Sequence, residues 1–149
     1  MPTTVKTTPD EMDQDWVPVQ PGLFAYPLAE GKEPVLLANR CTKCGKAFFP
    51  KRKFCPYCFK QGNMENIALE RQGIIYASTL VRIDSPAGIK APYAYGYVEL
   101  PTNRLRVFAL FTGSDPALFT PGQGVELVLE PVGMDKEGKK IIGYKFKLI

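Results

Sequence analysis

Apolar and polar residues alternate in the second half of the chain, and this pattern predicts β-strands. From Tyr93 to Leu100, one set of alternate positions holds three tyrosines and a glutamate, and the other holds Ala, Gly, Val and Leu. Residues 104 to 111 alternate in the same way, with Leu, Val, Ala and Phe on one side. Successive strand residues point to opposite faces of a sheet, so each segment has one face suited to a core. The intervening Pro101-Thr102-Asn103 is typical of a hairpin turn.

Three more segments complete a set of five predicted strands. Residues 74 to 83 are rich in β-branched and aromatic types, and residues 125 to 129 and 141 to 148 have the same character. The polar residues 134 to 138 predict a turn between the last two strands. Residues 114 to 119 predict one helical turn, with Ser114 or Asp115 as its N-cap and Pro116 in its first turn.

This order of elements indicates an OB-fold, a small Greek-key barrel of five strands with a short helical connection between the third and the fourth. An open five-stranded sheet is the alternative, but it would leave two unsealed edges. We therefore predict a mainly β protein whose residues 63–149 form an OB-fold domain.

The beginning of the chain has a different composition. Residues 1–34 contain six prolines and show neither a helical nor an alternating apolar period, which predicts an extended N-terminal arm. The apolar side chains of this arm either cover the protein's own surface or lie on another subunit. They are Trp16, Val17, Leu23, Phe24, Tyr26 and Leu28.

Between the arm and the barrel lie two Cys-x-x-Cys pairs, which contain all four cysteines of the chain: Cys41, Cys44, Cys55 and Cys58. Two such turns brought together offer four thiolates to one tetrahedral ion, the closed site expected of structural Zn²⁺. Gly45 follows the first pair, where a positive φ is often needed. Residues 35–38 and 48–50 predict short strands beside the pairs. We predict a zinc ribbon over residues 35–62.

Two other uses of the cysteines are possible in principle. Two disulfides would need an oxidising compartment, and no apolar leader follows Met1. A rubredoxin-like iron site uses the same four sulfurs, and the ligand type alone does not distinguish iron from zinc. With either metal, four sulfur ligands leave no coordination position for a substrate, so we expect the ion to stabilise the fold rather than to catalyse.

Composition limits the function further. Apolar residues make up 45% of the chain and charged residues 23%, which predicts a folded protein, and no apolar run approaches the length of a membrane span. We expect a soluble, cytoplasmic protein. The chain has no histidine, so a Ser-His-Asp or Cys-His device cannot be built. With its cysteines used as ligands, we expect no catalytic residue in the chain on its own.

Several motifs together resemble the DUF35 family of bacterial and archaeal proteins, in which a rubredoxin-like zinc ribbon precedes an OB-fold. The resemblance covers about residues 35 to 148. The motifs are Arg40-Cys41-x-x-Cys44-Gly45, Phe48-Phe49-Pro50, Cys55-Pro56-x-Cys58, Gly73-x-x-Tyr76-Ala77-Ser78-Thr79, Ala91-Pro92-Tyr93 and Pro121-Gly122-x-Gly124-Val125.

The resemblance implies a non-catalytic subunit of a heteromeric thiolase or acyl-CoA acyltransferase. Its partner would be a thiolase-fold catalytic subunit, in a hetero-oligomer such as α2β2. Family branches include thiolases of aromatic degradation such as benzoylsuccinyl-CoA thiolase, so the implied substrate is an aromatic or other 3-oxoacyl-CoA compound. The shared ligand would be CoA or acyl-CoA. The resemblance implies neither a nucleic-acid partner nor a membrane partner.

The ribbon carries the cations that could hold CoA phosphates. Residues 40–60 contain seven Lys and Arg side chains and no acid. Charge-assisted hydrogen bonds to phosphate are one use for them, and balancing the −2 charge of a Zn(Cys)₄ site is the other. The candidate phosphate contacts are Lys43, Lys46, Lys51, Arg52 and Lys53.

Two further functions remain as alternatives. Zinc ribbons and OB-folds also bind single-stranded nucleic acid, with bases stacked on barrel aromatics such as the stripe of Tyr93, Tyr95 and Tyr97. The barrel segment is close to neutral, however, whereas a groove that follows a phosphate backbone is basic. A rubredoxin-like electron carrier is the second alternative, and it would be coloured and redox-active.

Overall fold

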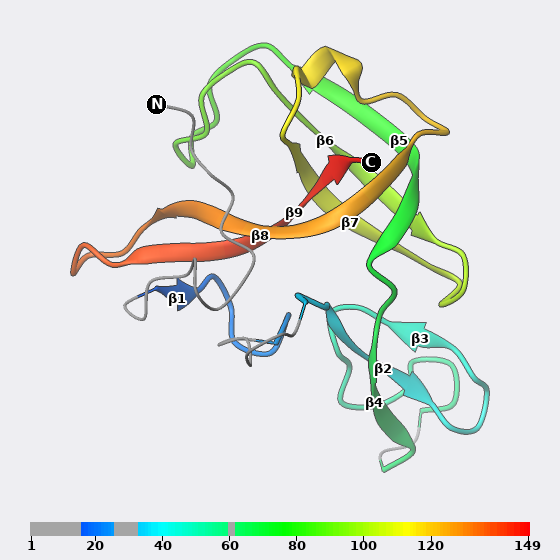
Figure 1. The fold of residues 1–149 in the computed structure, drawn as a ribbon. Coiled ribbons are helices and arrows are strands. Elements are labelled where there is room, and N and C mark those ends of the chain that lie inside the picture. Colours follow the sequence, from blue (N-terminus) through cyan, green and yellow to red (C-terminus); the bar gives the residue numbers. More distant parts are fainter. Residues whose placement is uncertain (1–15, 26–32, 60–61) are drawn as a thin grey trace.

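The computed structural model of the protein describes residues 16–25, 33–59 and 62–149, and it consists of two sheets (Figure 1). The larger sheet has six strands in the order β1-β9-β7-β6-β5-β8, and the smaller has three in the order β3-β2-β4. The predictions for residues 1–15, Tyr26, Leu28 and Lys60 lie outside the described residues. Within the described ranges, no helix is long and apolar enough to cross a membrane.

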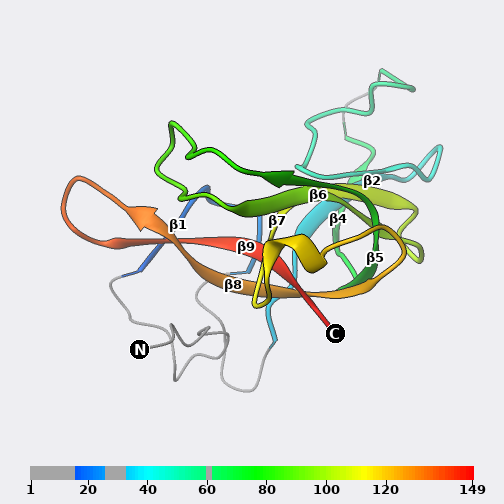
Figure 2. The same cartoon turned by 90° about the horizontal axis from the view of Figure 1, so that it is seen from above.

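Five strands of the larger sheet close into a barrel. They are β5 (Gln72–Val81), β6 (Tyr93–Leu100), β7 (Leu105–Thr112), β8 (Gly124–Met134) and β9 (Lys140–Leu148). Closure comes from β9, which pairs with β7 in parallel and with β8 in antiparallel orientation. This confirms the predicted five-stranded barrel rather than the open sheet, and Figure 2 shows the strands wrapping round from above.

One strand is longer than the sequence predicted. The prediction ended it at Leu129, but β8 continues to Met134 because its pairing with β9 resumes after a bulge between Pro131 and Gly133. Proline and glycine are depleted in regular strands, so the presence of Pro131 and Gly133 argued against a strand that continues beyond Leu129. A bulge tolerates both, since it interrupts the hydrogen-bonded ladder.

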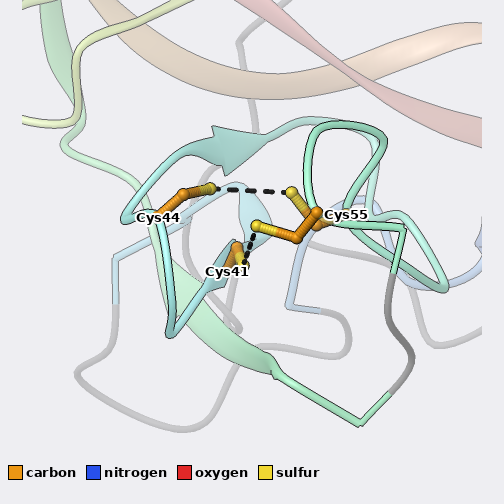
Figure 3. A group of neighbouring side chains, drawn as sticks. Cys41, Cys44 and Cys55 are labelled. Carbon is orange, nitrogen blue, oxygen red and sulfur yellow. Dashed lines mark hydrogen bonds between the residues drawn. The ribbon is translucent and has the colours of Figure 1, made fainter.

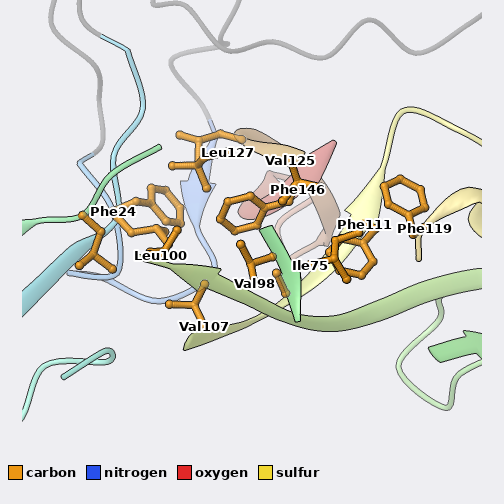
Figure 4. Close-up of a cluster of buried hydrophobic side chains, with 14 of the residues drawn as sticks. Phe24, Ile75, Val98, Leu100, Val107, Phe111, Phe119, Val125, Leu127 and Phe146 are labelled. Atoms are coloured by element: carbon orange, nitrogen blue, oxygen red, sulfur yellow. The ribbon is translucent and has the colours of Figure 1, made fainter. Parts of the chain in front are cut away.

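The core fills the barrel with the apolar faces that the alternation predicted (Figure 4). Along β6, buried residues alternate with half-buried or exposed ones, and β7 repeats the pattern. At one end, the rings of Phe111 and Phe119 stack with their centroids 4.9 Å apart. The most completely buried side chains include Val98, Leu100, Val107, Val125, Leu127, Leu129, Ile142 and Phe146.

The helical connection between β7 and β8 is a single 3-10 turn, η1 (Pro116–Leu118). Of the two N-caps predicted, Asp115 is the one used, because its Oδ1 accepts a hydrogen bond of 2.9 Å from the backbone N–H of Ala117. Pro116 stands in the first turn as expected.

The described part of the N-terminal arm covers the protein's own surface. Strand β1 (Val17–Pro18) adds to the larger sheet by pairing in parallel with β9. Trp16 and Phe24 are buried and belong to the core cluster. Of the two roles predicted for the apolar side chains of this arm, packing on the same chain is the one that these two residues fulfil.

The smaller sheet and its connecting loops carry the cysteines. It consists of β2 (Leu37–Cys41), β3 (Ala47–Phe48) and β4 (Met64–Ala68), with β2 in the middle. The strand predicted at residues 35–38 starts two residues later, at Leu37, and runs into the first cysteine as expected, because β4 pairs with it as far as Cys41. The pairing of β4 with β2 extends this sheet to Ala68, beyond the predicted ribbon boundary at residue 62.

Candidate metal centre and the adjoining cleft

The four cysteines meet at one point, as the spacing predicted. Their sulfur atoms all lie within 4.8 Å of one another. Cys44 Sγ is 3.6 Å from Cys55 Sγ (Figure 3). Cys41 Sγ is 3.9 Å from Cys58 Sγ. Each contact joins one Cys-x-x-Cys pair to the other. The set is therefore arranged for one tetrahedral ion of the zinc type, with no fourth position left for water or substrate.

Backbone turns present the sulfurs of the first pair. Cys41 ends β2, and its carbonyl accepts a hydrogen bond of 2.8 Å from the N–H of Gly45. Gly45 has a φ of 77°, the positive value predicted for it, and this lets the chain turn out of the pair and return as β3. In the second pair, the N–H of Phe59 donates to the carbonyl of Cys55 at 2.7 Å.

A buried asparagine holds the two halves of the ribbon together. Asn39 is 5% exposed, and its Nδ2 donates to the carbonyl oxygen of Arg52 at 2.6 Å. In return, the N–H of Arg52 donates to Asn39 Oδ1 at 3.1 Å. The side-chain amide of Asn39 thus makes the pair of hydrogen bonds to the loop before Cys55 that the backbone of a neighbouring strand would make. Sequence reasoning missed Asn39, although a polar residue between Leu37 and Cys41 at alternate positions of the strand is a usable signal.

The surroundings shift the pKa values of two of the cysteine thiols in opposite directions. The backbone N–H of Cys44, opposed by burial, lowers the pKa of Cys41 to about 7. Burial, followed by hydrogen bonds from the other cysteines, raises the pKa of Cys58 to about 12. Four sulfurs at this spacing cannot all be thiolates unless a cation offsets their charge, so the donor set fits a divalent metal ion.

A cleft of about 720 Å³ lies between the ribbon and the turn that joins β6 to β7. Its walls bring together cationic and aromatic side chains. Lys46 Nζ lies 4.5 Å from the ring centroid of Tyr57, and Arg40 pairs with Glu65 at 2.7 Å. Arg104 has a φ of 54°, unusual for a residue with a long side chain. The lining includes Arg40, Cys44, Lys46, Phe48, Tyr57, Ile67 and Arg104.

The five predicted phosphate contacts are not gathered in one place. All five are exposed, and of them Lys46 lines the cleft whereas Lys43, Lys51, Arg52 and Lys53 do not. The cleft instead adds Arg40 and Arg104, which sequence reasoning had not assigned to a ligand. Arg104 could not have been found from spacing, because the turn that carries it is far from the cysteines along the chain.

Two contacts fix the ribbon against the barrel. The ring of Phe49 meets the ring of Tyr144 edge-on, with centroids 5.7 Å apart, and Tyr144 Oη donates to the carbonyl of Phe108 at 2.7 Å. Near the start of β5, the N–H of Glu70 donates to Asn103 Oδ1 at 2.8 Å, and the N–H of Asn103 donates to Glu70 Oε2 at 3.0 Å. The cleft is therefore bounded by parts that are held together.

Known proteins share both parts of this arrangement. Residues 28–65 match the model of the ChsH2 rubredoxin-like zinc ribbon domain. The benzoylsuccinyl-CoA thiolase subunit BbsA of Thauera aromatica is 40% identical over 129 residues, which cover 87% of this chain and 86% of that protein. BbsA of Geobacter metallireducens is 35% identical, with 93% and 91% covered.

More distant relatives extend the likeness. A DUF35 domain-containing scaffold protein of Methanothermobacter thermautotrophicus is 33% identical, with 75% of this chain and 85% of that protein covered. Among solved structures, the Ltp2-ChsH2(DUF35) aldolase superposes with a TM-score of 0.57 at 23% identity, over 76% of this chain and 84% of that one. At that identity the superposition shows a shared fold.

Proposed function

Because the chain belongs to the DUF35 family of zinc-ribbon and OB-fold proteins, we propose that it is the non-catalytic zinc subunit of a thiolase complex. In this proposal it docks on a thiolase-fold catalytic subunit, helps to form the acyl-CoA site, and acts in the cytoplasm as part of an α2β2 hetero-oligomer. The substrates are aromatic or other 3-oxoacyl-CoA compounds, in line with the thiolase named in its 40% identical relative.

The observation that carries the proposal is the use of the cysteines. A thiolase reaction needs a nucleophile and a base, and thiols and imidazoles are the groups best suited to these roles near neutral pH. This chain has no histidine, and its four cysteines converge on one metal-type cluster. The reactive groups must then come from another subunit, which is the arrangement expected of an accessory protein.

The metal in this proposal is zinc, held by Cys41, Cys44, Cys55 and Cys58. It has a structural role, because four protein sulfurs complete its coordination and leave no site for a substrate oxygen. When bound, zinc supplies the attraction that holds the two Cys-x-x-Cys turns together. The ribbon in turn positions the cleft beside the barrel.

The ribbon's cations are proposed to contact CoA phosphates. Lys46 supports this best, since it lines the cleft together with Arg40 and Arg104. Lys43, Lys51, Arg52 and Lys53 are exposed on the same ribbon and would extend the positive surface toward a phosphate bound at the rim. Phosphate accepts hydrogen bonds from both ammonium and guanidinium groups.

Reconstitution tests the proposal directly. We expect the isolated chain to show no thiolysis of a 3-oxoacyl-CoA, the thiolase-fold subunit from the same genome to be weakly active alone, and the two together to be fully active. The measurement is CoA-dependent loss of the substrate's absorbance, with a chain treated with a zinc chelator as the control. Turnover by the isolated chain, or full activity of the thiolase-fold subunit without it, would contradict the accessory role.

A further inference from the structure

The outer face of the barrel at β5, β6 and β7 carries a group of large apolar side chains that we call the tyrosine face. Strand pairing sets it: Tyr97 stands opposite Ala77 on β5 and opposite Phe108 on β7. The exposed fractions are 51% for Tyr76, 48% for Tyr97, 46% for Phe108 and 44% for Ile74. Half-buried Tyr95 completes the face. These side chains point away from the core that fills the barrel.

The aromatic side chains of this face are already packed against one another. The ring centroid of Phe108 lies 5.3 Å from that of Tyr95 and 5.9 Å from that of Tyr97. The guanidinium carbon of Arg106 lies 3.6 Å from the ring centroid of Tyr76. Rings held in this way lose little rotamer freedom when a partner covers them, which lowers the entropic cost of association. The face is therefore preorganised for binding.

The composition is that of the centre of a protein interface. Such centres are enriched in Tyr, Phe and Arg and depleted in unpaired charge. Here the nearest charges, Glu99 and Arg106, lie 3.6 Å apart at the border and offset each other. From the exposed fractions, the large side chains offer roughly 300–400 Å² of apolar surface. A patch of this size matches the largest apolar patch on a typical monomer, which often serves a function.

The position of the cavities and the charge of the face favour a protein as its occupant. Small ligands bind in hollows, and neither the ribbon cleft nor the cavity lined by Glu99, Leu105 and Arg106 includes Tyr95, Tyr97 or Phe108 in its walls. Nucleic acid needs a basic track, whereas the cations and acids of this face are balanced. An aromatic surface whose charges offset each other matches a partner whose own contact surface is apolar and without net charge.

The area decides between a second copy and a larger partner. A stable interface buries about 800 Å² on each side, roughly twice what the face supplies. A two-fold copy that set the face only against itself would bury no more than this area on each side. A larger subunit can continue past the border at Arg106 to Arg104 and the ribbon cleft, because Arg104 lines both the border cavity and the cleft. That continuous surface is larger than the tyrosine face alone.

We infer that the tyrosine face is the central contact for the thiolase-fold subunit, with the ribbon cleft at the edge of the same interface. This inference rests on the proposed function and adds to it the residues that carry the docking energy. Tyr97 and Phe108 are at the centre, and Ile74 and Tyr76 lie toward the ribbon end of β5.

Matched charge insertions test the inference. Tyr97→Lys and Ile74→Lys place an ammonium group on the face, and Ile74→Lys stands opposite Glu99, which should accommodate it within the fold. Leu118→Lys makes the same change on η1, where Leu118 is 53% exposed, and is the control. With the thiolase-fold subunit of the same genome as the probe, we expect the two face variants to bind at least about 30-fold more weakly. The control should bind within twofold of the wild-type chain, about the limit of the measurement.

The outcomes separate the inference from the function. If the wild-type chain binds and Tyr97→Lys binds equally well, the inference is overturned while the proposed function stands. If the wild-type chain does not bind the thiolase-fold subunit, both fall. If Tyr97→Lys instead converts a self-associated wild-type chain to a monomer, the occupant is a second copy and the inference fails. Should the Lys variants not fold, benzoylphenylalanine introduced at Tyr97 must cross-link to the subunit and benzoylphenylalanine at Leu118 must not; equal or absent cross-linking at Tyr97 overturns the inference.

Discussion

At the scale of single residues, Tyr144 illustrates how one side chain serves both parts of the molecule. Its ring packs against Phe49 of the ribbon, and its hydroxyl donates to a backbone carbonyl of the barrel. Burial raises the pKa of Tyr144 from the ordinary value of 10.0 to about 12. The neutral hydroxyl is thus favoured in the folded protein more than in the unfolded chain.

The raised pKa of Tyr144 predicts that the contribution of this residue to stability depends on pH. The folded-state pKa is raised, so the stabilisation is complete below pH 10 and is lost as the pH rises toward 12. At pH 8, Tyr144→Phe should lower the free energy of unfolding by about 1 kcal/mol, because it removes one hydrogen bond and keeps the ring. Above pH 11 the difference between the two proteins should shrink or change sign. Urea unfolding at both pH values measures it, and a constant difference would contradict the assignment.

Other single residues mark the limit of what the sequence can predict. The four cysteines and the positive φ of Gly45 could be predicted because a metal turn has local spacing rules. Gly96 could not: a Cβ there would collide with the backbone carbonyl of Ala77 on the neighbouring strand, a contact that no local pattern encodes. Arg104 in the cleft was missed for the same reason, since its role depends on a ribbon distant in sequence.

At the scale of elements, the strands of the barrel were predictable and those of the ribbon much less so. Alternation over eight residues defines β6 and β7 almost to the residue, since one face is buried throughout. In the ribbon, β3 has two residues and β4 was not predicted at all, because Met-Glu-Asn-Ile-Ala has no fully buried face. The cysteine turns and the Asn39 side chain hold these short strands in place, and the composition of the strands does not predict them.

The Asn39 clamp yields a prediction for the ribbon as an element. Asn39→Ala leaves the backbone N–H and C=O of Arg52 without their partners, at a cost of about 1–3 kcal/mol. Because metal binding is coupled to ribbon folding, zinc affinity should fall by about tenfold or more. Competition with a chromophoric chelator measures this affinity. Arg52→Ala is the matched control, since Arg52 enters the clamp through its backbone, and an equal loss in both variants would contradict the role of the clamp.

At the scale of the whole molecule, the ribbon and the barrel form one unit because hydrogen bonds join them at their junction. The reciprocal pair of Glu70 and Asn103 ties the segment between β4 and β5 to the β6–β7 turn. Sequence reasoning predicted both parts but not how they sit together. Their contacts join residues 33 positions apart, and periodicity carries no information at that separation.

This junction predicts a specific loosening. Asn103→Ala removes the acceptor of the Glu70 N–H, so amide exchange at residues 69–71 should quicken by about tenfold, and stability should fall by about 1 kcal/mol. Thr102→Ala, an exposed substitution in the same turn, is the control and should leave exchange unchanged. Hydrogen–deuterium exchange followed by mass spectrometry resolves the segment. Equal protection in both variants would show that the junction is held by other contacts.

Because β9 pairs with three other strands, it determines the order in which the ribbon and the barrel can fold during translation. This strand pairs with β1, β7 and β8, so the barrel cannot close before residues 140–148 have left the ribosome. The three strands of the ribbon are complete once Ala68 has emerged. A nascent chain stalled shortly after that point can therefore capture its ion while most of the barrel is still unmade, and metal supply acts on the earliest stage of biogenesis.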